Sequence, residues 1–117
     1  MVKLCDIAGR ELYKIEDGYI KDFYGRYLYI IDNYEVREWS SRFVIFKFDG
    51  NIIRDFYGRH LYSFDGHYFK DFSGRILYVY EREQIAAFAS IPSHFIKGYP
   101  KNTEIAILII LFIINKK

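Results

Sequence analysis

The sequence has only one cysteine and two prolines, and each scarcity excludes a class of protein. With Cys5 alone, no intramolecular disulfide can form, which agrees with a reducing compartment. With so little proline and 51% hydrophobic residues, the chain is not a disordered tail or linker. No apolar stretch follows the first six residues, so we expect no signal peptide and take the cytoplasm as the default location.

The sequence also has little net charge, because 17 basic and 15 acidic residues leave a formal charge of +2. This is too small to indicate a polyanion, and we expect no nucleic-acid partner. Aromatic residues are abundant instead: twelve Tyr and eleven Phe help to bring the aromatic fraction to 21%, which is typical of strands. At 117 residues we expect a single domain over 1–117.

A short phrase returns five times along the chain, at intervals of 16 or 17 residues marked by Arg10, Arg26, Arg42, Arg59 and Arg75. Full copies read DFYGRYLYIID from Asp22, DFYGRHLYSFDG from Asp55 and DFSGRILYVYE from Asp71. The copies from Asp6 and Glu38 are degraded. A unit this short cannot bury its own apolar face, so the copies must pack on one another.

Each copy predicts two strands and two turns. In the fourth copy, Asp65-Gly66 is a strong hairpin signal, and the matching pairs are 16–17, 32–33 and 49–50. Asp-x-x-Gly favours a type I turn between hairpins. Five copies predict a mainly β fold: about ten antiparallel strands in an up-and-down meander over 2–81, curled or barrel-like, with a flat single-layer sheet as the alternative.

These turn positions place Tyr13 opposite Ile20, Tyr29 opposite Val36, Phe46 opposite Ile53, Tyr62 opposite Phe69 and Phe64 opposite His67. If the Asp-x-x-Gly loop counts four residues, one face of the sheet is apolar throughout. That face carries Tyr13, Ile15, Ile20, Tyr29, Ile31, Val36, Phe46, Phe48, Ile53, Tyr62, Phe64, Phe69, Tyr78 and Tyr80. The third copy has Ser41 in place of Gly and one extra residue before Asp49, which predicts a bulge.

The pattern changes in the segment 82–117. Residues 83–90 have an Ala-rich helical character that Pro92 would end, and 93–102 would form a loop. Thr103 is a possible N-cap for ten unbroken apolar residues, 105–114. Ten residues are too few to cross a bilayer as a helix. A buried helix packed on or inside the sheet is favoured by the cap, and a buried strand remains open because of the isoleucines.

No residue is a candidate catalytic group, and no cofactor or metal is expected. A side chain present in five copies suits a structural role better than catalysis, which needs an asymmetric constellation. His60 and His67 lack a thiolate partner, His60 would lie opposite Asp71, and Cys5 reads as a small buried apolar residue. The candidate binding surface is a row of aromatic residues at or near turns: Phe23, Tyr24, Trp39, Phe56, Tyr57 and Phe72.

The phrase from Asp55 to Gly66 resembles the short tandem β-hairpin repeats of bacterial proteins, and more loosely the Tyr-Asp repeats of large bacterial surface proteins. This likeness covers residues 6–81 and implies no activity, since turn-forming residues carry it. A meander followed by an apolar C-terminal helix also resembles the tubby-like and LURP-one-related folds, in which such a helix threads a closed barrel. That resemblance implies a topology and no binding residues.

Two functions follow as hypotheses. The first is a non-catalytic structural or protein-interaction module, which binds a protein partner or another copy of itself. The second is a membrane-surface or lipid-binding protein of the tubby-like type. An enzyme is a third class, for which no residue can be named.

Overall fold

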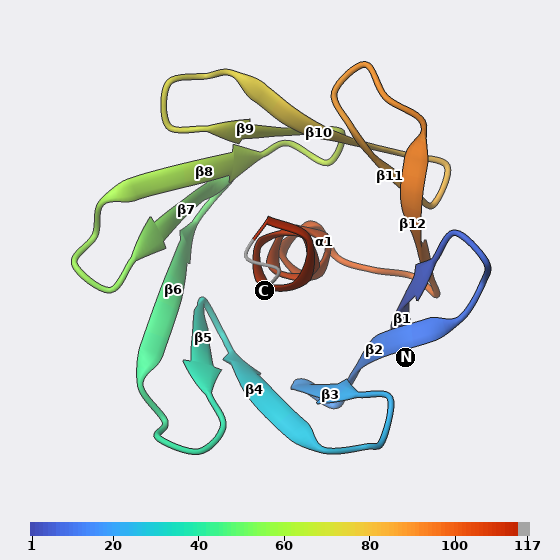
Figure 1. The fold of residues 1–117 in the computed structure, drawn as a ribbon. Helices are drawn as coiled ribbons and strands as arrows, with labels where there is room; N and C mark the ends of the chain where they lie inside the picture. The colour runs from blue at the N-terminus through green and yellow to red at the C-terminus, as the bar shows by residue number, and fades with distance from the viewer. Residues whose placement is uncertain (115–117) are drawn as a thin grey trace.

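The computed structural model describes residues 1–114, which form twelve antiparallel strands and one C-terminal helix with a π-helical extension (Figure 1). The strands are β1 (Val2–Asp6), β2 (Glu11–Glu16), β3 (Tyr19–Asp22), β4 (Tyr27–Asp32), β5 (Glu35–Glu38), β6 (Val44–Asp49), β7 (Ile52–Asp55), β8 (His60–Phe64), β9 (Tyr68–Asp71), β10 (Ile76–Glu81), β11 (Gln84–Ala87) and β12 (Pro92–Lys97). Each strand pairs with its neighbours in sequence. β12 pairs with β1, so the sheet is a closed barrel and not the flat alternative.

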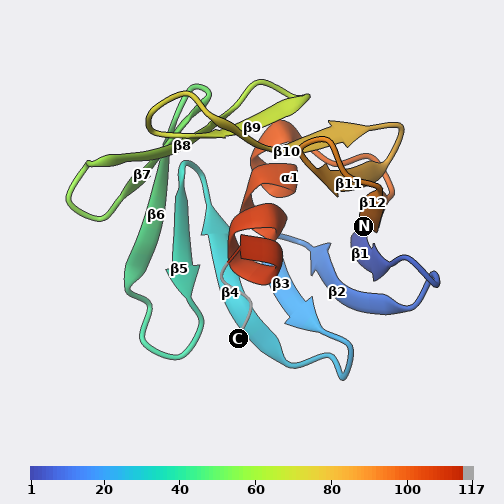
Figure 2. The ribbon, with the colours of Figure 1, turned by 45° about the horizontal axis from the view of Figure 1, so that its top comes forward.

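The C-terminal helix occupies the axis of the barrel, as Figures 1 and 2 show from two directions. α1 (Asn102–Ile109) continues into the π-helical segment η1 (Ile110–Ile114), which settles the choice between helix and strand for 105–114. Thr103 is not the N-cap. Lys101 holds that position in an extended conformation, and its backbone N–H donates to the Glu104 carboxylate at 2.8 Å.

Two sets of turns lie at opposite ends of the barrel. We call the connections β1–β2, β3–β4, β5–β6, β7–β8, β9–β10 and β11–β12 the outer turns, since they form the periphery in Figure 1. The other five connections are the inner turns. The helix begins near the inner turns, where Asn102 lies against Gly66, and ends near the outer turns, where Phe112 stacks on Tyr13. We call the end formed by the outer turns the mouth.

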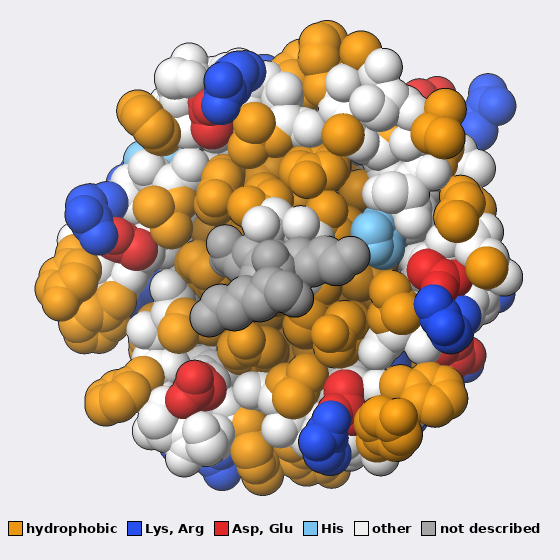
Figure 3. Space-filling model, in the orientation of Figure 1, with side chains coloured by type: hydrophobic (Ala, Val, Ile, Leu, Met, Phe, Trp, Pro, Cys, Tyr) orange, Lys and Arg blue, Asp and Glu red, His pale blue; other side chains and the backbone are white. Residues whose placement is uncertain are grey.

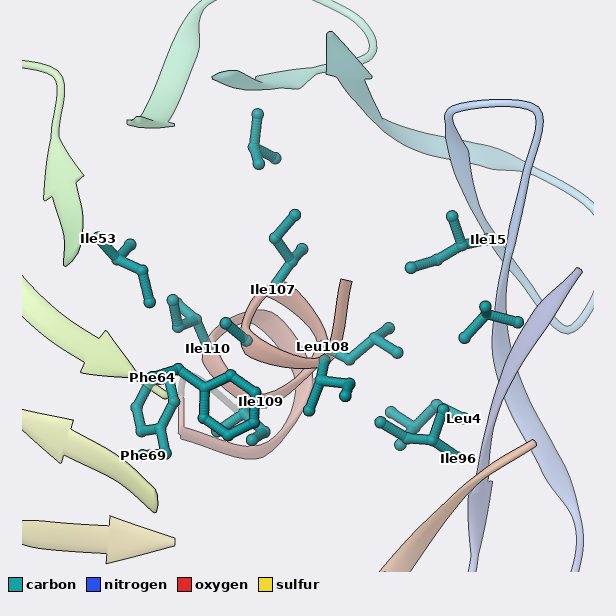
Figure 4. Packing of buried hydrophobic residues seen from close by; sticks show 14 of the residues in the cluster. Leu4, Ile15, Ile53, Phe64, Phe69, Ile96, Ile107, Leu108, Ile109 and Ile110 are labelled. Carbon is teal, nitrogen blue, oxygen red and sulfur yellow. The ribbon is translucent and has the colours of Figure 1, made fainter. Parts of the chain in front are cut away.

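The hydrophobic core consists of side chains that pack between the helix and the barrel wall (Figure 4). Helical residues from Ile105 to Ile110 are at most 3% exposed. They pack against wall residues such as Leu4, Ile53 and Phe69, all at most 1% exposed. Every residue of the predicted apolar face belongs to this cluster or packs against it. The alternation of side chains along the strands was therefore predicted correctly.

The predicted pairings across the inner turns are wrong by two residues. Tyr13 lies opposite Asp22, Tyr29 opposite Glu38, Phe46 opposite Asp55, Tyr62 opposite Asp71 and Phe64 opposite Phe69. The first three turns begin one residue later than predicted, at Asp17, Asn33 and Gly50. These residues hold positive φ of 54°, 56° and 61°, which Asp, Asn and Gly adopt more readily than other residues. A shift of two leaves every side chain on its predicted face.

The third copy absorbs its extra residue in its outer turn, which has five residues between β5 and β6 where its full counterparts have four. The expected bulge is present, with the register shifting between Val36 and Arg37. A similar shift occurs beside the other outer turns, so the bulge is not particular to this copy.

Residues 83–97 are neither a helix nor a loop, contrary to prediction. They form β11, an outer turn and β12, which complete a sixth hairpin. Pro92 begins β12 instead of ending a helix. The alanines favour a helix locally, but the barrel needs two more strands to close, and tertiary pairing overrides a weak local preference. The structure therefore contains twelve strands among residues 1–114, where the repeats predicted about ten.

Candidate binding surface at the mouth of the barrel

Each complete outer turn is built around one aspartate and the arginine four residues later. In the second copy, Asp22 Oδ1 accepts the backbone N–H groups of Tyr24 and Arg26 at 2.9 and 3.0 Å. Asp22 Oδ2 accepts Arg26 Nε at 2.6 Å, and Gly25 closes the turn with φ of +82°. Ion pairs of the same kind join Asp6 to Arg10, Asp55 to Arg59 and Asp71 to Arg75. The repeated aspartate thus holds both the turn and the arginine.

These contacts lower the pKa of the turn aspartates. For Asp6 the largest cause is the hydrogen bond from the backbone N–H of Arg10. Burial would raise the pKa of Asp22, but hydrogen bonds from Arg26 and Tyr24 outweigh it and leave the pKa below its usual value. The arginines meet the carboxylates through Nε while their side chains remain 73–76% exposed. The outer edge of each guanidinium therefore faces solvent.

Exposed aromatic rings occupy the tips of the same turns. The structure places five of the six candidate residues there, with exposed fractions of 55–81%: Phe23, Tyr24, Phe56, Tyr57 and Phe72. Phe23 meets Tyr24 edge-on at 5.5 Å, and the Arg26 guanidinium lies over the Tyr24 ring at 5.5 Å. Phe56, Tyr57 and Arg59 repeat this arrangement. Arginine and aromatic rings therefore form one unit at these tips.

Trp39, the sixth candidate, is only partly exposed. It stands in the third outer turn, where its ring packs perpendicular to Tyr27 at 4.7 Å and to Tyr19 at 5.8 Å. The Arg42 guanidinium lies over the indole at 4.1 Å. Trp39 therefore belongs to an aromatic cluster on the wall beside the mouth, and it is not a projecting tip.

Sequence reasoning missed four exposed apolar residues of the outer turns: Ile7, Phe43, Phe88 and Ile91. Phe88 and Ile91 lie in the sixth hairpin, which lacks the aspartate and arginine that mark the repeat. Ile7 occupies the position of Phe23 in its own copy, so alignment of the copies could have found it. With these residues included, every outer turn carries an exposed apolar side chain.

The centre of the mouth is apolar as well. The helix is buried from Ile105 to Ile110, but Leu111 to Ile114 are only partly buried, as are nearby Tyr13 and Tyr29. Figure 3 looks onto this end and shows hydrophobic side chains in many places between the middle of the view and the periphery, with acidic and basic side chains between them near the edge. The mouth is thus an apolar surface with a ring of charge-balanced turns.

The residues considered for chemistry lie elsewhere. His60 is opposite Arg54 and not Asp71, and His67 Nδ1 lies 2.9 Å from the Tyr80 carbonyl oxygen. Cys5 is fully buried, and burial raises the pKa of its thiol. Among residues 1–114, no three His, Cys, Asp or Glu side chains are grouped to hold a metal ion. No helix in the same range is long and apolar enough to span a bilayer.

Comparison with known proteins gives no match to a protein family, to a curated protein or to a solved structure.

Proposed function

We propose that this chain is a non-catalytic binding module that docks onto a membrane surface through the mouth of its barrel. The observation that carries the proposal is the set of exposed apolar side chains on all six outer turns, together with the partly buried helical residues Leu111 to Ile114. Soluble monomers rarely leave apolar patches larger than a few hundred Å² in contact with water. The apolar surface at the mouth lies across one end of a molecule of 36 × 35 × 27 Å, so we expect a binding partner to cover it.

The filled interior supports a binding role over catalysis. The axis of the barrel, where a ligand cavity would lie in a barrel of this size, is taken by the buried helical residues Ile105 to Ile110. The polar groups of the outer turns recur around the barrel and hold the turns themselves. Because the same polar groups recur in several turns, the rim is uniform. Catalysis needs instead an asymmetric arrangement of different side chains at one place.

A bilayer fits the distribution of side chains around the mouth. The apolar tips follow the whole circumference, so the surface favours no single direction, which suits a flat and laterally uniform partner. Aromatic rings prefer the interface between head groups and acyl chains. The exposed guanidinium edges beside them have the fork geometry that binds phosphate oxygens.

The charge balance of the rim favours a neutral lipid over an anionic one. Four outer-turn arginines are each paired with an aspartate, so the rim has little net charge despite its guanidinium groups. Docking by insertion of rings should therefore need no anionic lipid and should depend weakly on salt. The topology, a closed meander around an apolar C-terminal helix, is the one that the resemblance to tubby-like folds implies, and we include that relationship in the proposal.

A protein partner or a second copy of the chain is the second candidate. The observation that favours it is size, because the molecule measures 36 × 35 × 27 Å and a standard interface takes only roughly 800 Å² from each side. Aromatic residues and arginine are also enriched in such interfaces.

Co-sedimentation with vesicles of neutral phosphatidylcholine tests the proposal. The wild-type chain should sediment with the vesicles, and the double variant Phe56→Ser/Tyr57→Ser should sediment several-fold less. The matched control is Tyr34→Ser/Tyr99→Ser, which removes two rings that are 73% and 100% exposed but lie outside the outer turns. Absence of wild-type binding together with a stable dimer that Phe56→Ser/Tyr57→Ser dissociates would favour the second candidate.

A further inference from the structure

The third outer turn departs from the others in how its charges are satisfied. In four turns the arginine pairs with the carboxylate four residues before it. In the third turn, Arg42 lies instead over the Trp39 ring at 4.1 Å. Glu38 Oε1 accepts the hydroxyl groups of Ser40 and Ser41 at 3.1 and 2.8 Å, and none of the ion pairs found among residues 1–114 includes Glu38. One carboxylate of the rim is thus left without a cationic partner in the described chain.

This carboxylate borders a hollow with aromatic walls. The hollow has a volume of about 290 Å³, and the residues that line it include Glu38 and the aromatic residues Tyr27, Tyr29, Trp39 and Phe112. Tyr27 meets Trp39 at 90° and Tyr29 meets Phe112 at 64°, so the rings present both edges and faces. Tyr29 lies opposite Glu38 in the β4–β5 ladder. Burial is the largest cause that raises the pKa of Tyr29, and the negative charge of Glu38 raises it further.

We propose that this hollow binds an alkylated ammonium cation, such as a trimethylammonium group, with its methyl groups against the aromatic residues of the lining and Glu38 beside its charge. Ring faces attract cations through the aromatic quadrupole, and recognition of quaternary ammonium groups commonly uses several rings. The Arg42 guanidinium over Trp39 shows that this indole already attracts a cation. A volume near the low end of the usual range for ligand sites, about 300–1,000 Å³, suits a small head group.

The composition of the hollow disfavours other ligands. A hard metal ion needs six or more oxygen ligands, and the hollow offers one carboxylate, a serine hydroxyl and tyrosine hydroxyls. A neutral apolar ligand would leave Glu38 without a cationic partner. An alkylated ammonium ion combines apolar surface with positive charge. Its apolar surface can contact the aromatic residues of the hollow, and its charge can pair with Glu38.

The site is independent of the membrane proposal, although it opens at the same end of the barrel. A trimethylammonium group can come from a small soluble molecule or from the head group of a choline lipid. The chemistry of recognition is the same for both sources, and the experiment separates them.

Trp39 is the only tryptophan of the chain and lines the hollow, so its fluorescence reports binding directly. Titration with tetramethylammonium chloride, without vesicles, should give a saturable change that sodium chloride at equal ionic strength does not give. Glu38→Gln keeps the shape of the side chain and removes its charge. We expect Glu38→Gln to bind tetramethylammonium about fivefold more weakly or worse, which corresponds to a loss of about 1 kcal/mol in binding free energy.

Two controls make the test specific. Phe72→Ser alters an exposed ring of another outer turn and should leave the affinity for tetramethylammonium unchanged. The uncharged isostere 3,3-dimethylbutanol should bind the wild-type chain several-fold more weakly than tetramethylammonium. The site is disproved if sodium chloride reproduces the fluorescence change, if no saturation occurs, or if folded Glu38→Gln binds as tightly as wild type.

Competition then identifies the source of the cation. If the site takes a lipid head group, tetramethylammonium should weaken binding to phosphatidylcholine vesicles and leave binding to phosphatidylglycerol vesicles unchanged. If the ligand is a soluble molecule, neither vesicle is affected. Both results support the cation site, and they differ only in the source they assign.

Discussion

Phe112 of the helix stacks on Tyr13 of β2 with ring centroids 3.6 Å apart and planes within 13° of parallel. This contact joins the end of the central helix to the barrel wall at the mouth. Together with the buried residues from Ile105 to Ile110, it makes the helix the core of the sheet. The helix buries the apolar inner face of the barrel, and the barrel buries the apolar side chains of the helix. Neither surface would be stable in water without the other.

Ending the chain at Lys101 should therefore give an aggregated or unfolded product. Each large side chain buried on the axis contributes about 1.5–3 kcal/mol, so the helix accounts for stability comparable to that of a whole small domain. Phe112→Ala is the milder control: it should lower the free energy of unfolding by about 2 kcal/mol, since this ring is only partly buried. Circular dichroism melts and size-exclusion chromatography measure both. A soluble monomeric truncation with a cooperative melt would show that the barrel has another core.

Gly58→Ala should lower the free energy of unfolding by about 1 kcal/mol or more, because Gly58 holds φ of +86° in its outer turn. An added Cβ would meet no atom within 4 Å, so the cost comes from the backbone conformation and not from a clash. Gly58→Asn should cost less, since Asn enters the left-handed region more readily. Urea unfolding compares the two variants, and an unchanged midpoint for Gly58→Ala would contradict this account of the turn.

The turn aspartates should make the protein sensitive to acid. Their folded-state pKa values are lowered, so their stabilisation is complete above the unfolded value of about 3.9 and is lost as the pH falls further through the folded values. We expect the free energy of unfolding to decrease below about pH 4. In Asp55→Asn this decrease should be smaller, with Asp49→Asn, at an exposed position, as the control for loss of one charge. Equal pH dependence in wild type and Asp55→Asn would argue against the role of the turn carboxylates.

No single arginine of the outer turns should be essential for binding to phosphatidylcholine vesicles. The contact is spread around the rim, so we expect each of Arg10→Ala, Arg26→Ala, Arg59→Ala and Arg75→Ala to change the affinity by less than about threefold, near the roughly 0.5 kcal/mol typical of surface substitutions. Co-sedimentation of the four variants measures this. If one variant lost binding while its three counterparts kept it, the surface would contain a specific site at that turn.

The sequence predicted the part of the fold that depends on alternation and repetition. Ile20, Tyr29 and Ile53 point inward as expected, because their positions relative to each other are set by a period of two. The pairing was displaced because a turn signal such as Glu16-Asp17-Gly18 does not show which residue takes the first positive φ. The sixth hairpin escaped recognition because Ala87 and Ile91 stand where other copies have Asp and Arg. Closure of the barrel depends on that hairpin.

The candidate surface was predictable where it repeats and unpredictable where it does not. Phe23 and Phe56 share one position in aligned copies, so their common location at the turns could be read from the sequence. The hollow beside Glu38 could not, because it brings Phe112 of the helix next to residues of β4 and the third outer turn. Whether Phe112 lies close to those residues depends on how far the helix extends along the barrel axis, which the sequence does not show.

The most direct test of membrane docking uses Trp39, which is the only tryptophan and lies beside the mouth. Its fluorescence is measured with vesicles of phosphatidylcholine and with vesicles whose acyl chains carry bromine, a quencher that acts at short range. If the mouth docks on the bilayer, brominated vesicles should quench Trp39 and ordinary vesicles should not, and Phe56→Ser/Tyr57→Ser should reduce the quenching several-fold. Vesicle binding with an unquenched Trp39, or no binding at all, would contradict the proposal.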